Sequence, residues 1–203
     1  MAFWKRKKDP QKGRRGEFEG LKREARKAPL PSDRAHLLNM AGDIALEIGD
    51  DAGAMSVLGE ALDVYLHDRD YRAARAIGRK LLRVRSGTVR VRSTLTWLAI
   101  AQDMPEDARV ALDLYVTSIK SDADRAFAVK HLTAMSEATD DPGLRREIAE
   151  HLAGIGQEDA ARAITDRLQA EAEGRAAPPS PERVREKWEE ALARLVSPEK
   201  RGA

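Results

Sequence analysis

Two rows of side chains at helical spacing are the strongest chemical feature of this sequence. Each row follows the spacing i, i+3, i+7 and i+11, which places its members on one face of a helix. The first row is polar and consists of His36, Asn39, Asp43 and Glu47; the second consists of Arg72, Arg75, Arg79 and Arg83. Guanidinium groups are charged at any relevant pH and hold carboxylates or phosphates with paired hydrogen bonds. The two rows therefore predict a surface that binds a partner.

The charges around these rows are strongly segregated along the chain. Residues 35–68 carry 7 acidic and no Lys or Arg side chains, whereas residues 69–92 carry 9 basic side chains and 1 acidic one. Helices of opposite charge can neutralise each other when they pack side by side. The arginine row is thus either a solvated face salt-bridged to the acidic helices before it, or a surface that attracts an acidic partner.

A second candidate contact lies at the N-terminus, where two aromatic side chains precede a basic cluster. Its residues are Phe3, Trp4, Lys5, Arg6, Lys7 and Lys8. This composition suits the surface of an anionic membrane, at about 1 kcal/mol for each basic residue. It also suits nucleic-acid phosphates, although nothing in it reads bases. A solvated tail is the third interpretation, and the sequence leaves all three open.

The residue types that usually carry catalysis are absent or scattered. The chain has no cysteine and 4 histidines, at His36, His67, His131 and His151, and none belongs to a recognised metal-binding motif. Asp63 and Glu147 each lie one helical turn before a histidine, His67 and His151 respectively. A single carboxylate beside a histidine is typical of a salt bridge, whereas a metal ion would need further ligands. We therefore expect no enzymatic activity, no cofactor, no metal and no small-molecule substrate.

Neither a membrane span nor a secretion signal is expected. No run of about eighteen apolar residues occurs, and the first residues are charged where a signal peptide would be apolar. These observations predict a cytoplasmic protein, with peripheral contact at the inner face of the membrane if the basic cluster binds lipid.

The elements that position the two rows are predicted to be helices. Aromatic residues make up 4% of the chain, and aliphatic residues recur at three and four positions through its body, which favours an all-α fold. Helical hairpins begin near residues 35, 70, 105 and 142, a period of about 35 residues typical of stacked helix pairs. The predicted parts are a basic, disordered arm (1–31), a helical repeat domain (32–173), a Pro-rich linker (174–181), an amphipathic helix (182–197) and a tail (198–203).

The amphipathic helix at the C-terminal end has one apolar face. Ser180 and Pro181 are suited to its first turn, and Val184, Trp188, Leu192 and Leu195 follow at helical spacing. This face can cap the last hairpin of the array, or it can dock on another protein as a helix in a groove.

Residues 35–68 resemble one unit of the tetratricopeptide repeat (TPR) family, and weaker echoes continue to about residue 173. The match consists of small residues at Gly42 and Ala54, the turn Gly49-Asp50, and the pair Ala61-Leu62. The resemblance implies a right-handed array of antiparallel hairpins, about eight helices in all, whose first helices line a concave surface. It also implies a non-catalytic scaffold that binds a protein or peptide segment there. A nucleic-acid-associated protein that uses the basic arm and the arginine row is the alternative.

Overall fold

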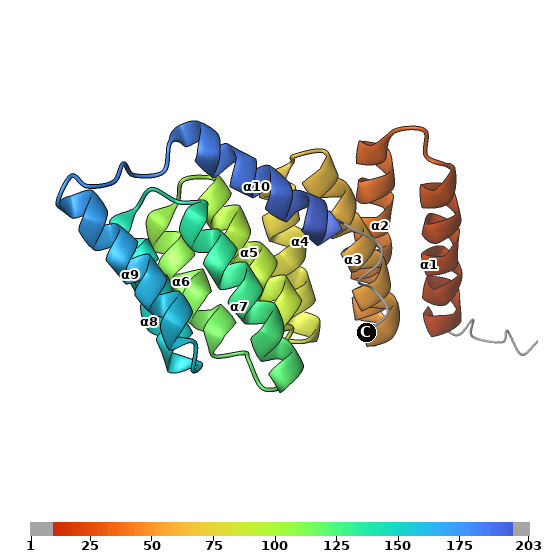
Figure 1. The fold of residues 1–203 in the computed structure, drawn as a ribbon. Helices are drawn as coiled ribbons and strands as arrows, with labels where there is room; N and C mark the ends of the chain where they lie inside the picture. The colour runs from red at the N-terminus through yellow and green to blue at the C-terminus, as the bar shows by residue number, and fades with distance from the viewer. Residues whose placement is uncertain (1–9, 197–203) are drawn as a thin grey trace, which may run out of the picture. The chain divides into compact units, whose positions relative to one another are not determined.

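The protein is all-helical in the part of the chain that the structure describes. This computed structural model describes the backbone of residues 10–196 and the side chains of residues 11–193, and contains ten helices and no strand in that range (Figure 1). The predicted aromatic and basic cluster at Phe3–Lys8 and the tail 198–203 lie outside the described residues. The helices are α1 (Pro10–Lys27), α2 (Pro31–Glu47), α3 (Asp51–His67), α4 (Tyr71–Val84), α5 (Val89–Ala101), α6 (Pro105–Val116), α7 (Asp122–Glu137), α8 (Pro142–Gly154), α9 (Glu158–Ala172) and α10 (Pro181–Val196).

The chain divides into two compact units, and the boundary falls inside the span 32–173 that the sequence treats as one domain. Unit 1 is Met1–Ser86, with α1 to α4, and unit 2 is Gly87–Ala203, with α5 to α10. Arg85 leaves α4 with extended backbone, and Ser86 and Gly87 are exposed. The helical pattern on either side of this break is continuous, so periodicity alone does not reveal the boundary.

In unit 1, α2 and α3 pack closely because a glycine lies at their crossing. A Cβ atom built on Gly42 would lie 2.4 Å from Leu58 Cδ2, and Leu58 itself is fully buried. The turn between the two helices uses Gly49 at φ 72°, which favours glycine, and Asp50, whose side chain accepts a hydrogen bond from the backbone N–H of Gly53. Ala54 and Ala61 on α3 are also fully buried.

The expected disordered arm is wrong for Pro10–Lys27, which form α1. Phe18 and Ala25 lie two turns apart and are 3% and 1% exposed, and α1 packs against α2. The low apolar content of residues 1–31 suggested disorder. However, two well-spaced apolar side chains are enough when a neighbouring helix supplies the rest of the buried surface.

In unit 2, helix ends follow the signals in the sequence. Ser121 and Asp124 form the capping box that their spacing predicts, each side chain accepting a backbone N–H of the other residue. Pro105 opens α6, and Ser180 accepts the backbone N–H of Arg183 at the start of α10. In unit 1, by contrast, α2 begins at Pro31, after Leu30, and no side chain caps it.

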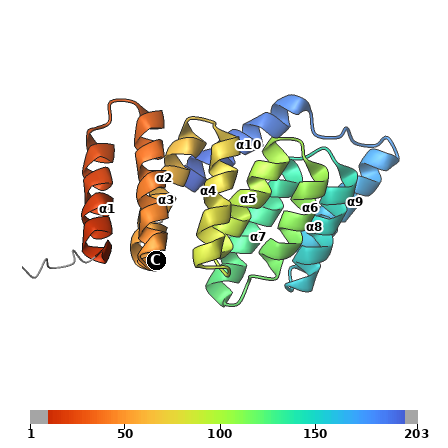
Figure 2. The ribbon, with the colours of Figure 1, turned by 180° about the vertical axis from the view of Figure 1, so that it is seen from behind.

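The core of unit 2 is built around Trp97 of α5, which is fully buried. Its Nε1–H donates to His131 Nδ1 at 3.1 Å, and the ring of Trp188 lies 5.9 Å from the Trp97 ring. The main contacts of α10 are therefore with α7 and α5 rather than with the last hairpin, which α8 and α9 form. In Figure 1 α10 crosses in front of α5 and α7, and the reversed view in Figure 2 places it behind them.

No helix within residues 10–196 is both long enough and apolar enough to cross a membrane.

The crossing of α2 and α3 gives a paired test. Gly42→Ala should lower the free energy of unfolding by about 1 to 2 kcal/mol, because the added methyl group meets Leu58 in a packed core. Gly59→Ala is the control within α3, where a Cβ meets nothing within 4 Å. This change should instead raise stability by about 0.5 to 1 kcal/mol through helix propensity. Urea denaturation of both variants measures the two signs, and equal effects would contradict the close approach.

Candidate functional site

Helix α4 separates its apolar and charged side chains onto opposite faces. Ala74, Ile77, Gly78 and Leu81 are buried, and α4 packs with this face against α3. On the opposite face Arg72, Arg79 and Arg83 are exposed, while Arg75 is half-buried on one flank. The arginine row that the sequence predicts is therefore on the surface of unit 1, with three of its four members open to solvent.

Helix α2 presents the predicted polar row on its own outer face. His36 and Glu47 are exposed, and Asn39 and Asp43 are half-buried. Met40 lies one turn after His36 on this face and is 41% exposed, which is unusual for a large apolar side chain in unit 1. The face of α2 thus offers an apolar contact framed by polar groups.

A lysine joins the faces of α2 and α4. Lys80 Nζ donates to Asn39 Oδ1 at 2.8 Å and to the two carboxylate oxygens of Asp43 at 2.6 and 2.9 Å. The Lys80 side chain is 22% exposed, so part of its stem is covered. This bridge links α2 to α4 and satisfies Asn39 and Asp43 without any member of the arginine row.

The second carboxylate of the α2 row is neutralised from the other side. Glu47 lies 3.0 Å from the guanidinium of Arg14 on α1, and both side chains are about half exposed. Lys80 and Arg14 therefore balance the two negative charges of the α2 row, Asp43 and Glu47. Asp43 and Glu47 therefore pair with Lys80 and Arg14, not with the arginine row.

Most of the positive charge of the arginine row is therefore not neutralised by a described acidic side chain. Within the described residues, no ion pair or side-chain hydrogen bond involves Arg72, Arg79 or Arg83. Arg79 and Arg83 are one turn apart, and like charges at that spacing cost a helix a few tenths of a kcal/mol. Three uncompensated guanidinium groups on one side of a helix can bind carboxylates or phosphates.

The sequence predicted the two rows but missed three residues that define the surface. Lys80 lies beside the arginine row, Met40 between members of the α2 row, and Arg14 in the segment expected to be disordered. The opposite charges of residues 35–68 and 69–92 indicate that ion pairs form between these segments. They do not indicate which basic residue pairs with which acidic one.

The histidines do not form a metal or catalytic cluster. His131 is buried beside Trp97, and His151 Nε2 lies 3.0 Å from Asp113 of α6, while Glu147, one turn before His151, pairs with Arg109. Among residues 10–196, no group of three His, Asp or Glu side chains is arranged to hold a metal ion.

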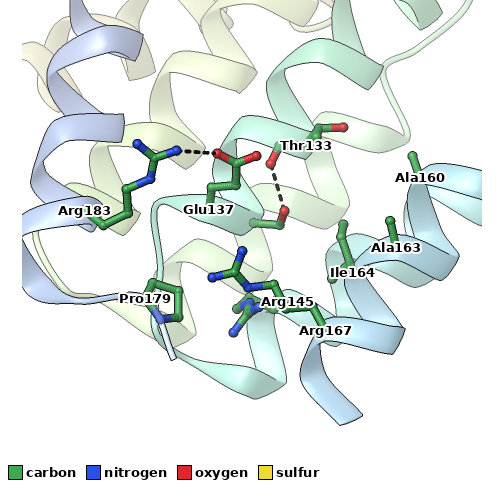
Figure 3. A pocket seen from close by; sticks show the side chains of 10 residues that line it. Thr133, Glu137, Arg145, Ala160, Ala163, Ile164, Arg167, Pro179 and Arg183 are labelled. Carbon is green, nitrogen blue, oxygen red and sulfur yellow. Dashed lines mark hydrogen bonds and ion pairs between the residues drawn. The ribbon is translucent and has the colours of Figure 1, made fainter. Parts of the chain in front are cut away.

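Unit 2 contains a cavity of about 280 Å³ among α7, α8, α9 and the start of α10 (Figure 3). Arg145, Arg167 and Arg183 reach its wall from three different helices. Arg145 is 2% exposed, and its guanidinium donates to both carboxylate oxygens of Glu171 at 2.6 and 3.1 Å. These hydrogen bonds lower the pKa of Glu171, with Arg167 contributing in the same direction. The pair neutralises the buried charge of Arg145.

The bridge between α2 and α4 predicts a specific energetic coupling. A double-mutant cycle of Asp43→Asn and Lys80→Met should give a coupling of about 0.5 to 1 kcal/mol in unfolding free energy, reduced by salt. The matched cycle of Asp43→Asn and Arg79→Met should give a coupling near zero. A larger coupling with Arg79 than with Lys80 would show that the arginine row is engaged with α2 after all.

Comparison with protein-family models, curated proteins and solved structures found no match for this chain. The resemblance of residues 35–68 to tetratricopeptide repeats therefore stays a prediction that rests on the residues themselves.

Proposed function

We propose that this protein is a non-catalytic helical scaffold that binds an acidic segment of another protein on the outer face of α4. One observation carries the proposal: Arg72, Arg79 and Arg83 are exposed and form no ion pair with any described residue, while Asp43 and Glu47 of α2 are paired with Lys80 and Arg14. Charge that the fold does not use internally is available for a partner.

The dimensions of the arginine row indicate the size of this segment. The rise from Arg72 to Arg83 along α4 is about 16 Å. An extended chain of about five residues covers that length. A short segment rich in Asp and Glu therefore fits the row, with alternate carboxylates within reach of successive guanidinium groups.

The neighbouring face of α2 favours a protein partner over a nucleic acid. Met40 offers exposed apolar surface, and His36 offers a hydrogen-bonding group at the same face. A peptide can place an apolar side chain on Met40, whereas a phosphate backbone has no group to place there. Phosphates suit the arginine row equally well. The experiment must therefore distinguish binding of an acidic peptide from binding of a nucleic acid.

The TPR-like arrangement is part of the same proposal. It is supported by the close crossing at Gly42, the turn at Gly49-Asp50 and the full burial of Ala54 and Ala61. In such an array, helices that alternate along the chain line one surface, and the Lys80 bridge joins α2 to α4 in this alternating manner. A cytoplasmic location goes with this proposal.

Charge reversal on α4 tests the proposed function. The double change Arg79→Glu and Arg83→Glu should weaken binding of a fluorescein-labelled Glu-rich peptide by about tenfold or more, because attraction becomes repulsion. Fluorescence anisotropy at about 0.1 M salt, where the screening length is about 10 Å, measures the affinity. Circular dichroism should be unchanged, since both residues are exposed.

The matched control reverses two exposed arginines elsewhere, Arg125 and Arg162, and should leave peptide affinity within about twofold once net charge is accounted for. Equal losses in both double variants would contradict a specific surface. Tighter binding of duplex DNA or single-stranded RNA than of the peptide, with a steep loss as salt rises, would favour the nucleic-acid function.

The N-terminal basic cluster makes a separate prediction about membranes. If Phe3–Lys8 bind lipid, the full chain should sediment with vesicles containing phosphatidylserine, and a chain lacking residues 1–9 should not, because each basic residue contributes about 1 kcal/mol. Removal of residues 1–9 leaves α1 intact. Equal sedimentation of both chains would remove the membrane contact from the proposal.

A further inference from the structure

A buried arginine in the wall of the unit 2 cavity has an unused hydrogen-bond donor (Figure 3). Arg145 of α8 is 2% exposed, and its Nη1 and Nη2 atoms donate to the two carboxylate oxygens of Glu171. Its Nε is buried and has no hydrogen-bond partner among the described residues. A buried donor without an acceptor lowers the stability of a fold, so a ligand that supplies the acceptor would stabilise this site.

The positive charge beside Arg145 exceeds the negative charge. Oε1 of Glu171 accepts hydrogen bonds from Arg145 Nη2 at 3.1 Å and from Arg167 Nε at 3.0 Å. Two guanidinium groups therefore converge on one carboxylate, and both line the cavity. No other described acidic side chain forms an ion pair with either arginine. One positive charge is thus left over at this point of the wall.

The third arginine of the wall does not add to this surplus. The guanidinium of Arg183 lies 2.7 Å from Glu186 and 3.8 Å from Glu137, and Glu137 also pairs with Lys187 at 3.0 Å. Figure 3 shows Glu137 and Arg183 on the opposite side of the cavity from Ile164. The anionic group of a ligand therefore belongs at Arg145 and Arg167, where no acidic side chain is left unpaired.

Helix α9 supplies an apolar wall that leads to Arg167. Ala160, Ala163 and Ile164 line the cavity from one face of this helix, and Arg167 follows one turn later. The rise from Ala160 to Arg167 is about 10 Å. A cavity of about 280 Å³ is at the lower end of the range for small-molecule sites. Because Ala163 is exposed, such a molecule can enter from solvent.

We propose that this cavity binds a small monocarboxylate with a short aliphatic chain. Its carboxylate accepts from Arg145 Nε and from the guanidinium of Arg167, and its chain lies along Ile164 towards Ala160. A monoanion matches the one surplus positive charge. A phosphate dianion exceeds that charge, and inorganic phosphate has no apolar group for the α9 wall.

This ligand is bound and not converted, so the expectation of no small-molecule substrate stands. The sequence does not reveal the site, because its arginines are far apart in the chain and come together only through the packing of α8 and α9. The whole cavity lies in unit 2, so the proposal is independent of the arginine row of α4 in unit 1.

Hexanoate is the probe for this cavity, and hexan-1-ol is its uncharged counterpart. Titration of the full chain with hexanoate should shift the Nε–Hε NMR signals of Arg145 and Arg167 to saturation, with a dissociation constant of about 1 mM or lower. Hexan-1-ol at the same concentrations should leave both signals in place, because it brings no acceptor of matching charge.

A matched pair of variants on α9 tests the surplus charge. Arg167→Met removes it and keeps the hydrogen bonds between Arg145 and Glu171, so hexanoate affinity measured by calorimetry should fall about fivefold or more. Arg162→Met makes the same change in net charge at an exposed position outside the cavity, and should change the affinity less than about twofold.

Ala160→Leu tests whether the ligand lies inside the cavity. It keeps every arginine and extends a half-buried side chain of the wall into the space, so hexanoate binding should be lost while the helical circular dichroism is retained. Absence of a saturable shift at Arg145, equal losses in Arg162→Met and Arg167→Met, or unchanged binding by a folded Ala160→Leu chain would overturn the proposal. Displacement of hexanoate by a lower concentration of inorganic phosphate would assign the site to phosphate and would equally overturn it.

Discussion

The close approach of α2 and α3 at Gly42 is the packing constraint on which the unit 1 surface depends. A Cβ atom at this position would lie 2.4 Å from Cδ2 of Leu58, which is fully buried. Helix α3 packs against both α2 and α4. The distance between α2 and α3 therefore affects how far α2 lies from α4. Lys80 reaches Asp43 across this distance, so a local steric requirement sets the geometry of a charged surface.

Among the described residues, the charged members of the α2 row are paired, whereas three of the four arginines of the α4 row are not. Asp43 and Glu47 each have a cationic partner on another helix, and these contacts link α2 to α4 and to α1. Arg72, Arg79 and Arg83 contribute nothing comparable to the fold, and their mutual repulsion is a small cost in stability. Residues that cost stability without packing are the ones expected to serve binding.

Local features of the fold could be predicted from the sequence, whereas the pairing of elements could not. The capping box of Ser121 and Asp124 is local, and so is the helical periodicity that predicted an all-α chain. By contrast, α1 is buried through Phe18 against a helix that begins after it, and Trp188 packs on Trp97, 91 residues earlier in the chain. Such contacts depend on tertiary packing, which periodicity does not encode. The arginine row was visible as a spacing, but its exposure became clear only once Lys80 was seen to neutralise Asp43.

The central claim is that an acidic protein segment lies along the arginine face of α4. Nitrogen-15 NMR of arginine Nε–Hε groups tests it most directly, because each guanidinium reports its own contacts. Titration with a Glu-rich peptide should shift the signals of Arg72, Arg79 and Arg83 together with a single affinity, and leave Arg145, which is held by Glu171, unchanged. Shifts spread evenly over exposed arginines, or confined to arginines outside α4, would contradict the account.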